Sequence, residues 1–152
     1  MRFNVFMIAC SLTLGIATPC RADPPDFLAI DHIALHVRSL DASANWYQSH
    51  FGLRVLHKWN GVWMVGRGNI KIGLFLTSPL NPVADAEHAV IIEHFALSVD
   101  GDKFQGVIDQ LRTEGVTLTA VEDTGIAYSV FTYDPDGHSV EITTYHWDKP
   151  PK

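Results

Sequence analysis

The sequence predicts an α+β fold made of two βαβββ modules, and three observations support this prediction. A seven-residue phrase occurs twice, at residues 31–37 and 93–99, with an acid, a histidine and apolar residues at matching places. Such a repeat is typical of a duplicated supersecondary unit. Each copy is followed by a stretch with helical periodicity that ends at a glycine. Three short strand-like runs then follow each helix, so the order strand, helix, strand, strand, strand is expected twice.

The first module is expected at about residues 29–77. Its helix follows the first strand, with Ser39 or Asp41 as the N-cap. Gly52 is expected to end this helix, because glycine readily adopts the left-handed backbone found at helix C-termini. Asn-Gly and Gly-Asn pairs supply the turns between the later strands. The strands predicted for this module are residues 30–37, 53–59, 62–65 and 70–77.

A connector at residues 78–89, with two prolines and no periodicity, precedes the second module at about residues 90–146. A helix is predicted at residues 102–114, with Gly115 as its stop. The Asp-Pro-Asp-Gly sequence at residues 134–137 predicts a turn between the last two strands. The strands predicted for this module are residues 91–99, 116–121, 126–133 and 139–145.

Residues 1–22 have the pattern of a secretory signal peptide. Arg2 precedes an apolar run at residues 5–17, and Cys20 and Ala22 place small residues at the −3 and −1 positions of a cleavage site. The run is short for a membrane span, although an uncleaved membrane anchor remains the main alternative. The protein is therefore expected to be periplasmic or secreted. Both cysteines leave with the peptide, which would exclude catalysis by a protein thiol.

Cleavage would leave residues 23–152 as a single domain that is long enough to bury a core without disulfides. Removing Arg2 and Arg21 leaves 9 basic against 17 acidic residues, a formal charge of −8. This charge opposes binding to nucleic acid and to anionic membrane surfaces. We therefore expect a small-molecule partner, with no nucleic acid and no membrane attachment after cleavage.

The histidines of the repeat point to a metal site. Because side chains alternate along a strand, His32 and His94 fall on matching faces, opposite the bulky apolar residues. Glu141 falls on the corresponding face of the last strand, where burial without a cationic partner would be costly. A lone strand histidine is usually structural or solvent-facing, and Glu141 alone could be a surface acid. Together they predict a metal site, since two histidines and one carboxylate commonly bind Fe, Mn, Zn or Ni.

This combination resembles the vicinal oxygen chelate superfamily, which includes glyoxalase I, extradiol dioxygenases, fosfomycin-resistance transferases and bleomycin-binding proteins. The resemblance rests on the doubled βαβββ order, on His32 and His94 at strand starts, and on Asp-Pro-Asp-Gly-His at residues 134–138 before Glu141. It covers about residues 29–145. It implies a cupped eight-stranded mixed sheet with helices on the outer face. It also implies one divalent metal ion bound by His32, His94 and Glu141, and a substrate chelated through adjacent oxygens.

The resemblance does not specify the reaction. Gly73 stands where glyoxalase I carries a further carboxylate, so three protein ligands are expected. Ala34 stands where the transferases place a threonine, and Phe131 stands near the place of a dioxygenase tyrosine. Retention of all three ligands argues against a non-catalytic binder. We expect an exported metal-dependent enzyme, lyase-like or isomerase-like, with an extradiol-type dioxygenase, a fosfomycin-type transferase and a non-catalytic binding or resistance protein as the alternatives.

Other residues are candidates for the same site. His36 shares a face with His32 and is a candidate catalytic base. Trp59, Trp63 and Tyr128 could line the substrate pocket, although aromatic residues of short strands more often belong to a core. Small members of the superfamily are often homodimers in which modules of two chains form each cup. The sequence is consistent with such an exchanged homodimer and equally with a site inside one chain.

Overall fold

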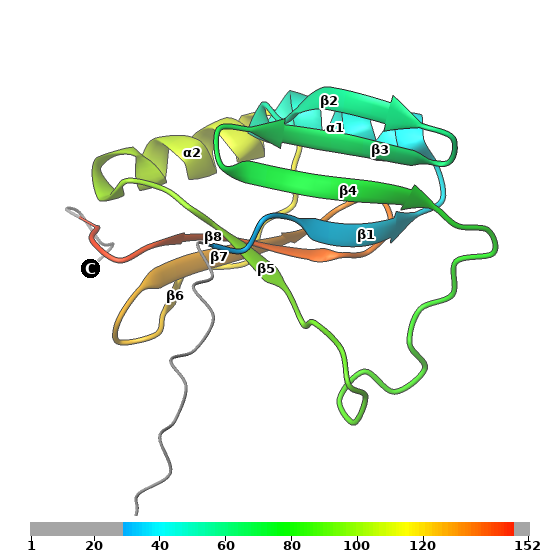
Figure 1. Ribbon diagram of the computed structural model, residues 1–152. Helices are drawn as coiled ribbons and strands as arrows, with labels where there is room; N and C mark the ends of the chain where they lie inside the picture. The colour runs from blue at the N-terminus through cyan, green and yellow to red at the C-terminus, as the bar shows by residue number, and fades with distance from the viewer. Residues whose placement is uncertain (1–28, 148–152) are drawn as a thin grey trace, which may run out of the picture.

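The computed structural model describes residues 29–147, and the predicted signal peptide at residues 1–22 lies outside them. The first module contains β1 (Ile33–Val37), α1 (Leu40–Phe51), β2 (Arg54–Trp59), β3 (Val62–Arg67) and β4 (Ile70–Leu76) (Figure 1). The second module contains β5 (Phe95–Ser98), α2 (Gly101–Thr113), β6 (Glu122–Asp123), β7 (Tyr128–Tyr133) and β8 (Ser139–Thr144). In this described part of the chain, no helix has the length and apolar character needed to cross a membrane.

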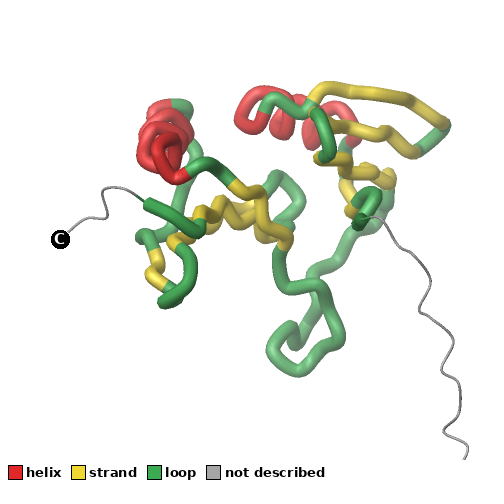
Figure 2. The backbone as a smooth tube through the Cα atoms, turned by 60° about the vertical axis from the view of Figure 1, so that its left-hand side comes forward, coloured by secondary structure: helices red, strands yellow, loops and turns green. Residues whose placement is uncertain are grey.

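The strands form two four-stranded mixed sheets with the same topology. The strand order is β1-β4-β3-β2 in the first sheet and β5-β8-β7-β6 in the second. In each sheet the first and last strands of the module pair in parallel, and the remaining neighbours are antiparallel. This topology confirms the predicted α+β fold of two βαβββ modules. The strands of each sheet pair only with strands of the same module. The connector between β4 and β5 extends away from both sheets (Figure 2).

The ends of both helices agree with the predicted caps. Of the two candidate N-caps of α1, Ser39 has the role, because its hydroxyl accepts a hydrogen bond from the backbone nitrogen of Ala42 at 3.3 Å. Gly52 ends α1 with a φ of 65°, a left-handed conformation that disfavours side chains. Gly115 follows α2 with a φ of 82°. The chain can therefore turn sharply from each helix into its next segment.

The clearest departure from prediction is the second strand of the second module. A strand was expected at residues 116–121, but β6 contains only Glu122–Asp123. Thr119 donates its backbone nitrogen to the carbonyl of Phe131 at 3.0 Å, as in a ladder. The reciprocal bond is different, because the backbone nitrogen of Phe131 donates to the Thr119 hydroxyl at 3.0 Å. A threonine side chain thus replaces a main-chain acceptor, and regular pairing is interrupted there.

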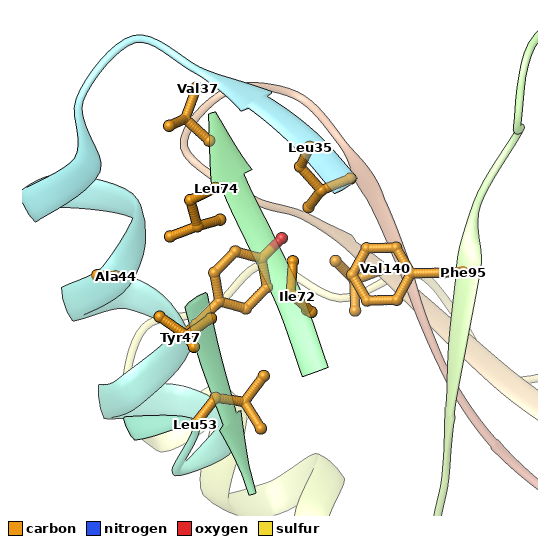
Figure 3. Packing of buried hydrophobic residues seen from close by; sticks show 10 residues of the cluster. Leu35, Val37, Ala44, Tyr47, Leu53, Ile72, Leu74, Phe95 and Val140 are labelled. Atoms are coloured by element: carbon orange, nitrogen blue, oxygen red, sulfur yellow. The ribbon is translucent and has the colours of Figure 1, made fainter. Parts of the chain in front are cut away.

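Each helix covers one face of the sheet in its own module, above a hydrophobic core. In the first module, Tyr47 of α1 is fully buried against Ile72 and Leu74 of β4 (Figure 3). Phe95 and Val140 of the second module join the same cluster, so the modules share part of this core. A second cluster lies beneath α2 and contains Phe104, Ile108, Leu111, Val130, Ile142 and Trp147. Within residues 29–147, no helix covers the opposite face of either sheet.

A buried polar contact also joins the modules. Tyr47 of α1 donates from its hydroxyl to Asp134 Oδ2 at 2.8 Å. Asp134 follows β7, is 5% exposed, and accepts from the backbone nitrogens of Asp136 and His138 through its other oxygen, both at 2.9 Å. Burial and the neighbouring Asp134 carboxylate raise the pKa of the Tyr47 hydroxyl, so it remains a donor.

Asp136 forms a second set of polar contacts between the two modules. Arg38 donates to its Oδ1 from the backbone nitrogen and from Nε, both at 3.0 Å, and Ser43 donates to Oδ2 at 2.7 Å. Burial opposes the charge on Asp136, but these bonds outweigh it and lower the pKa of its carboxyl. His138 places Nε2 2.7 Å from the backbone oxygen of His36. The predicted turn at residues 134–137 therefore also fastens the second module to the first.

Two glycines of α2 should respond oppositely to alanine. A Cβ at Gly101 would overlap the backbone carbonyl of His146, which cannot rotate away. We expect Gly101→Ala to lower the free energy of unfolding by about 2 kcal/mol or more, as overpacking does. Gly106→Ala is the matched control, since a Cβ there meets nothing within 4 Å and should stabilise the helix by about 0.5–1 kcal/mol. Urea denaturation of both variants measures the difference, and equal effects would contradict this packing.

Candidate metal site on the open sheet faces

The face of the second sheet that lacks helix cover brings two predicted ligands together. His94 immediately precedes β5, and Glu141 lies in the adjacent strand β8. His94 Nε2 lies 3.0 Å from Glu141 Oε2, with the side chains 35% and 13% exposed. The parallel pairing of β5 with β8 produces this contact, because it aligns Ala96 with Glu141. An imidazole and a carboxylate therefore meet at a site that solvent can still reach.

Neighbouring residues of β7 hold this pair in place. Ser129 donates from its hydroxyl to Glu141 Oε1 at 2.5 Å, which leaves Oε2 directed at His94. Thr143 lies 3.0 Å from the same serine oxygen and completes the chain of hydroxyls. The ring of Phe131 contacts the imidazole of His94 edge-on, with 5.4 Å between centroids. Both functional side chains are thus oriented by contacts within their own module.

Sequence reasoning missed Ser129. The signal was present, because β7 and β8 form a hairpin whose register follows from the turn at residues 134–137. Counting back from that turn places Ser129 opposite Thr143, two residue pairs away from Glu141 and therefore on the same face. A hydroxyl next to a candidate ligand on that face was a readable indication of a supporting hydrogen bond.

His32 has different neighbours. Its Nδ1 lies 3.0 Å from Asp31 Oδ2, and Lys71 of β4 forms an ion pair with the other oxygen of Asp31. The hydrogen bonds from Lys71 and from His32 lower the pKa of the Asp31 carboxyl. A carboxylate at Nδ1 favours the tautomer in which Nε2 carries a free lone pair, as ligating histidines require. The contact with Asp31 therefore favours a lone pair on Nε2 of His32.

One chain brings together two of the three predicted ligands. Within residues 29–147, no group of three histidine, cysteine, aspartate or glutamate side chains is close enough to hold a metal ion. His94 and Glu141 are in contact, whereas His32 lies beside Asp31 and Lys71 of the first sheet. The donor set of an imidazole nitrogen and a carboxylate oxygen fits a transition metal, with the third donor still to be supplied.

His36 lies on the open face of the first sheet, as predicted. Its Nδ1 is 2.5 Å from the hydroxyl of Thr77, and its ring lies 6.3 Å from that of Phe75. The exposed side of β1 also carries Ala34, whereas Leu35 and Val37 are buried beneath α1. His36 is accordingly fixed at one nitrogen and open to solvent on the face that it shares with His32.

The three predicted pocket aromatics do not share one face. Trp59 lies on the open face of the first sheet, opposite Val62, and is 52% exposed. Trp63 faces the other way and packs against the first core, because its position opposite Leu74 belongs to the helix-covered side. Tyr128 packs against the second core, with its ring 5.3 Å from that of Trp147. Trp63 and Tyr128 are therefore partly buried on the helix-covered sides of the sheets, whereas Trp59 lies on the open face.

Comparisons with known proteins agree with this fold. The sequence profile of the Glyoxalase/Bleomycin resistance protein/Dioxygenase superfamily matches residues 29–142. The chain belongs to this superfamily. Lactoylglutathione lyase from Agrobacterium tumefaciens is 25% identical, with a TM-score of 0.63 over 80% of this chain and 96% of that one.

Two further structures of the superfamily fold are similar at lower identity. A glyoxylase/bleomycin resistance protein/dioxygenase domain from Frankia sp. EAN1pec is 18% identical, with a TM-score of 0.66 over 82% of this chain and 96% of that one. Oxidase ChaP-H2 is 20% identical, with a TM-score of 0.60 over 80% of this chain and 97% of that one. These similarities confirm the superfamily fold. Because proteins that share a fold can differ in chemistry, the activity depends on the residues of the site.

Proposed function

We propose that this protein is a metal-dependent enzyme that acts on a small substrate chelated through vicinal oxygens, with lyase-like or isomerase-like chemistry. The contact between His94 Nε2 and Glu141 Oε2 at 3.0 Å carries the proposal. It joins the two ligands predicted from the second module, and the bond from Ser129 keeps the carboxylate in place. Membership of the superfamily and the similarity to a lactoylglutathione lyase support the same class of reaction.

We further propose that two copies of the chain share each site. His32 would join His94 and Glu141 of a second copy, since these residues do not meet within the described part of one chain. The open faces support this arrangement, because Ala34 and Ala96, small residues of the edge strands β1 and β5, are exposed in the single chain and would be covered in a cup. A twofold dimer with exchanged modules would close both faces at once and form two equal sites.

The chain's own residues would bind and orient the substrate. A divalent ion at these ligands would supply Lewis acidity and stabilise negative charge on a chelated oxygen. His36, held by Thr77, is the candidate base for a proton of the substrate. Trp59 and Phe75 add aromatic surface on the same face.

An extradiol-type dioxygenase is the second candidate. Two histidines and one carboxylate are also the ligand set of iron enzymes that activate oxygen, because three positions stay open. Gly73 supports three ligands rather than four, since no side chain extends from β4 at the place of a further carboxylate. Iron with substrate-dependent oxygen uptake would favour this candidate. Two alternative functions remain for the same assays to distinguish: a fosfomycin-type transferase and a non-catalytic binding or resistance protein.

Elemental analysis tests the proposed metal centre. We expect about one metal ion per chain in purified wild-type protein, and less than about a tenth of that in His94→Ala, because each lost ligand weakens binding greatly. His88→Ala is the matched control, since this exposed histidine of the connector pairs with Asp85, away from His94 and Glu141. It should keep its metal. A folded wild-type protein that binds no transition metal would refute the proposal and favour a metal-free binder.

We also propose that the protein is exported and cleaved after Ala22, as the apolar run at residues 5–17 suggests. Mass spectrometry of the protein from a host cell tests this. A mature N-terminus at Asp23 is expected in the exported fraction, and an intact N-terminus at the membrane would indicate an anchor instead.

A further inference from the structure

The two carboxylate oxygens of Glu141 have different surroundings in the second sheet. The residues directly opposite Glu141 are Ala96 of β5 and Phe131 of β7, and neither side chain carries a hydrogen-bond donor. Ser129 lies diagonally across on β7, on the same open face, because every second residue of a strand shares a face. Among the described residues, Glu141 Oε1 contacts Ser129, and Oε2 contacts His94. One oxygen is therefore engaged within the sheet, and the other faces the second candidate ligand.

The hydroxyl proton of Ser129 is directed at Glu141. The serine Oγ and Glu141 Oε1 are 2.5 Å apart, a distance typical of a hydroxyl that donates to a carboxylate. A carboxylate that binds a metal ion carries no proton, so the serine is the donor. Serine has a single hydroxyl proton, and Thr143 must therefore donate in the 3.0 Å contact between the two hydroxyls. The bonds from Thr143 to Ser129 and from Ser129 to Glu141 strengthen each other, because each polarises the next.

Burial makes this arrangement hard to exchange for another. Ser129 is 1% exposed and Thr143 is 7% exposed, so solvent does not replace a lost hydrogen bond there. If Oε1 of Glu141 turned away, the buried serine proton would lose a charged acceptor and keep only a neutral one. Hydrogen bonds to charged groups are the stronger kind, so the exchange is unfavourable. Oε1 is accordingly held against β7.

We infer that Ser129 makes Glu141 a metal ligand that binds through one oxygen, because the serine occupies Oε1 and leaves Oε2 for the ion. The inference rests on the proposed function, since it concerns the ion that His94 and Glu141 would hold. It adds to that function the number of coordination positions that the protein leaves open, and it assigns the control of that number to a residue that does not itself bind the ion.

The number of open positions determines what can bind beside the substrate. In an octahedral site, two imidazoles and a carboxylate bound through one oxygen leave about three positions open, whereas a carboxylate bound through both oxygens leaves about two. A substrate chelated through two oxygens fills two positions. A further position, for water or another small ligand, therefore exists only when Glu141 binds through one oxygen. Ser129 is in this sense a positioning residue, because it acts through Glu141.

Counting the water ligands of a bound manganese ion tests the inference. Pulsed electron paramagnetic resonance in isotopically labelled water detects the water molecules that bind Mn²⁺ directly. In full-length protein loaded with Mn²⁺, we expect about three such waters in the wild type and about two in Ser129→Ala, because the released Oε1 then also binds the ion. Thr144→Val is the matched control. It removes a hydroxyl that is equally buried in β8 and donates to the backbone oxygen of His146 at 3.1 Å, on the face opposite Glu141, and it should keep about three waters.

A second measurement uses the wild-type protein alone and decides the question if Ser129→Ala loses its metal. The two stretching frequencies of a carboxylate lie further apart when it binds through one oxygen than when it binds through both. The infrared difference between zinc-loaded and metal-free protein should show the wide separation, in a band that is absent from Glu141→Gln. A narrow separation, or equal water counts in the wild type and Ser129→Ala, would overturn the inference and leave the metal centre standing. A wild-type protein that binds neither Mn²⁺ nor Zn²⁺ would refute the proposed function, and this inference with it.

Discussion

Asp134→Ala is expected to lower the free energy of unfolding by about 3–5 kcal/mol, among the largest effects of any single substitution in the described chain. The carboxylate is 5% exposed and accepts three hydrogen bonds, one from the Tyr47 hydroxyl and two from backbone nitrogens of the turn. Alanine would leave those donors buried without partners and loosen the contact between modules. Urea denaturation followed by circular dichroism measures the loss.

A double-mutant cycle isolates the bond between Asp134 and Tyr47. Tyr47→Phe alone should cost about 1–3 kcal/mol, because it leaves one carboxylate oxygen without its donor. The double variant should cost less than the sum of the single variants, since both remove the same bond. Tyr133→Phe is the matched control, as its ring is 66% exposed, and should change stability little. Additive effects, or a cost below about 1 kcal/mol for Asp134→Ala, would contradict the buried contact.

The pH dependence of the free energy of unfolding tests the contact between Tyr47 and Asp134 independently. The pKa of Tyr47 in the folded state is raised above its ordinary value of 10.0. Stability from this group is therefore fully present below pH 10 and is lost as the pH rises above it, because the unfolded chain ionises first. The alkaline loss of stability should be smaller in Tyr47→Phe than in the wild-type protein.

Much of this fold could be predicted because local signals agree with the tertiary structure. Ser39 and Gly52 mark the ends of α1, and alternation separates the buried face of β1 from its histidine face. The strand at residues 116–121 could not be predicted correctly. Its apolar alternation is that of a strand, but the hydroxyl of Thr119 bonds the backbone of Phe131 and interrupts the ladder. The hydrophobic periodicity of a sequence does not indicate whether a backbone nitrogen will donate to a side-chain or to a main-chain acceptor.

The candidate site was predictable in part for similar reasons. His94 and Glu141 follow from strand alternation within one module, and the structure places them in contact. Trp63 and Tyr128 pack against the two cores, and the sequence did not indicate this because an aromatic residue suits a core and a pocket equally. Their faces depend on the strand register, which places them beneath the helices. The position of His32 relative to the other two depends on how modules assemble, which no local pattern encodes.

The shared site makes the strongest functional prediction. Glu141→Gln and His32→Ala homodimers should each lose metal and activity, because every site in either dimer lacks one ligand. In an exchanged dimer, a mixed pair of these variants contains one site with both defects and one site with none. The intact site takes His32 from the Glu141→Gln chain and takes His94 and Glu141 from the His32→Ala chain.

Mixing the two inactive variants after unfolding and refolding them together is therefore the most direct test of a metal site built by two copies. If the chains pair at random, half of the dimers are mixed and about a quarter of all sites are intact, so metal content and activity should recover to about a quarter of wild type. Refolding each variant alone should recover neither. If the mixture also stays inactive and free of metal while its chains form mixed dimers, the three ligands do not converge across two copies.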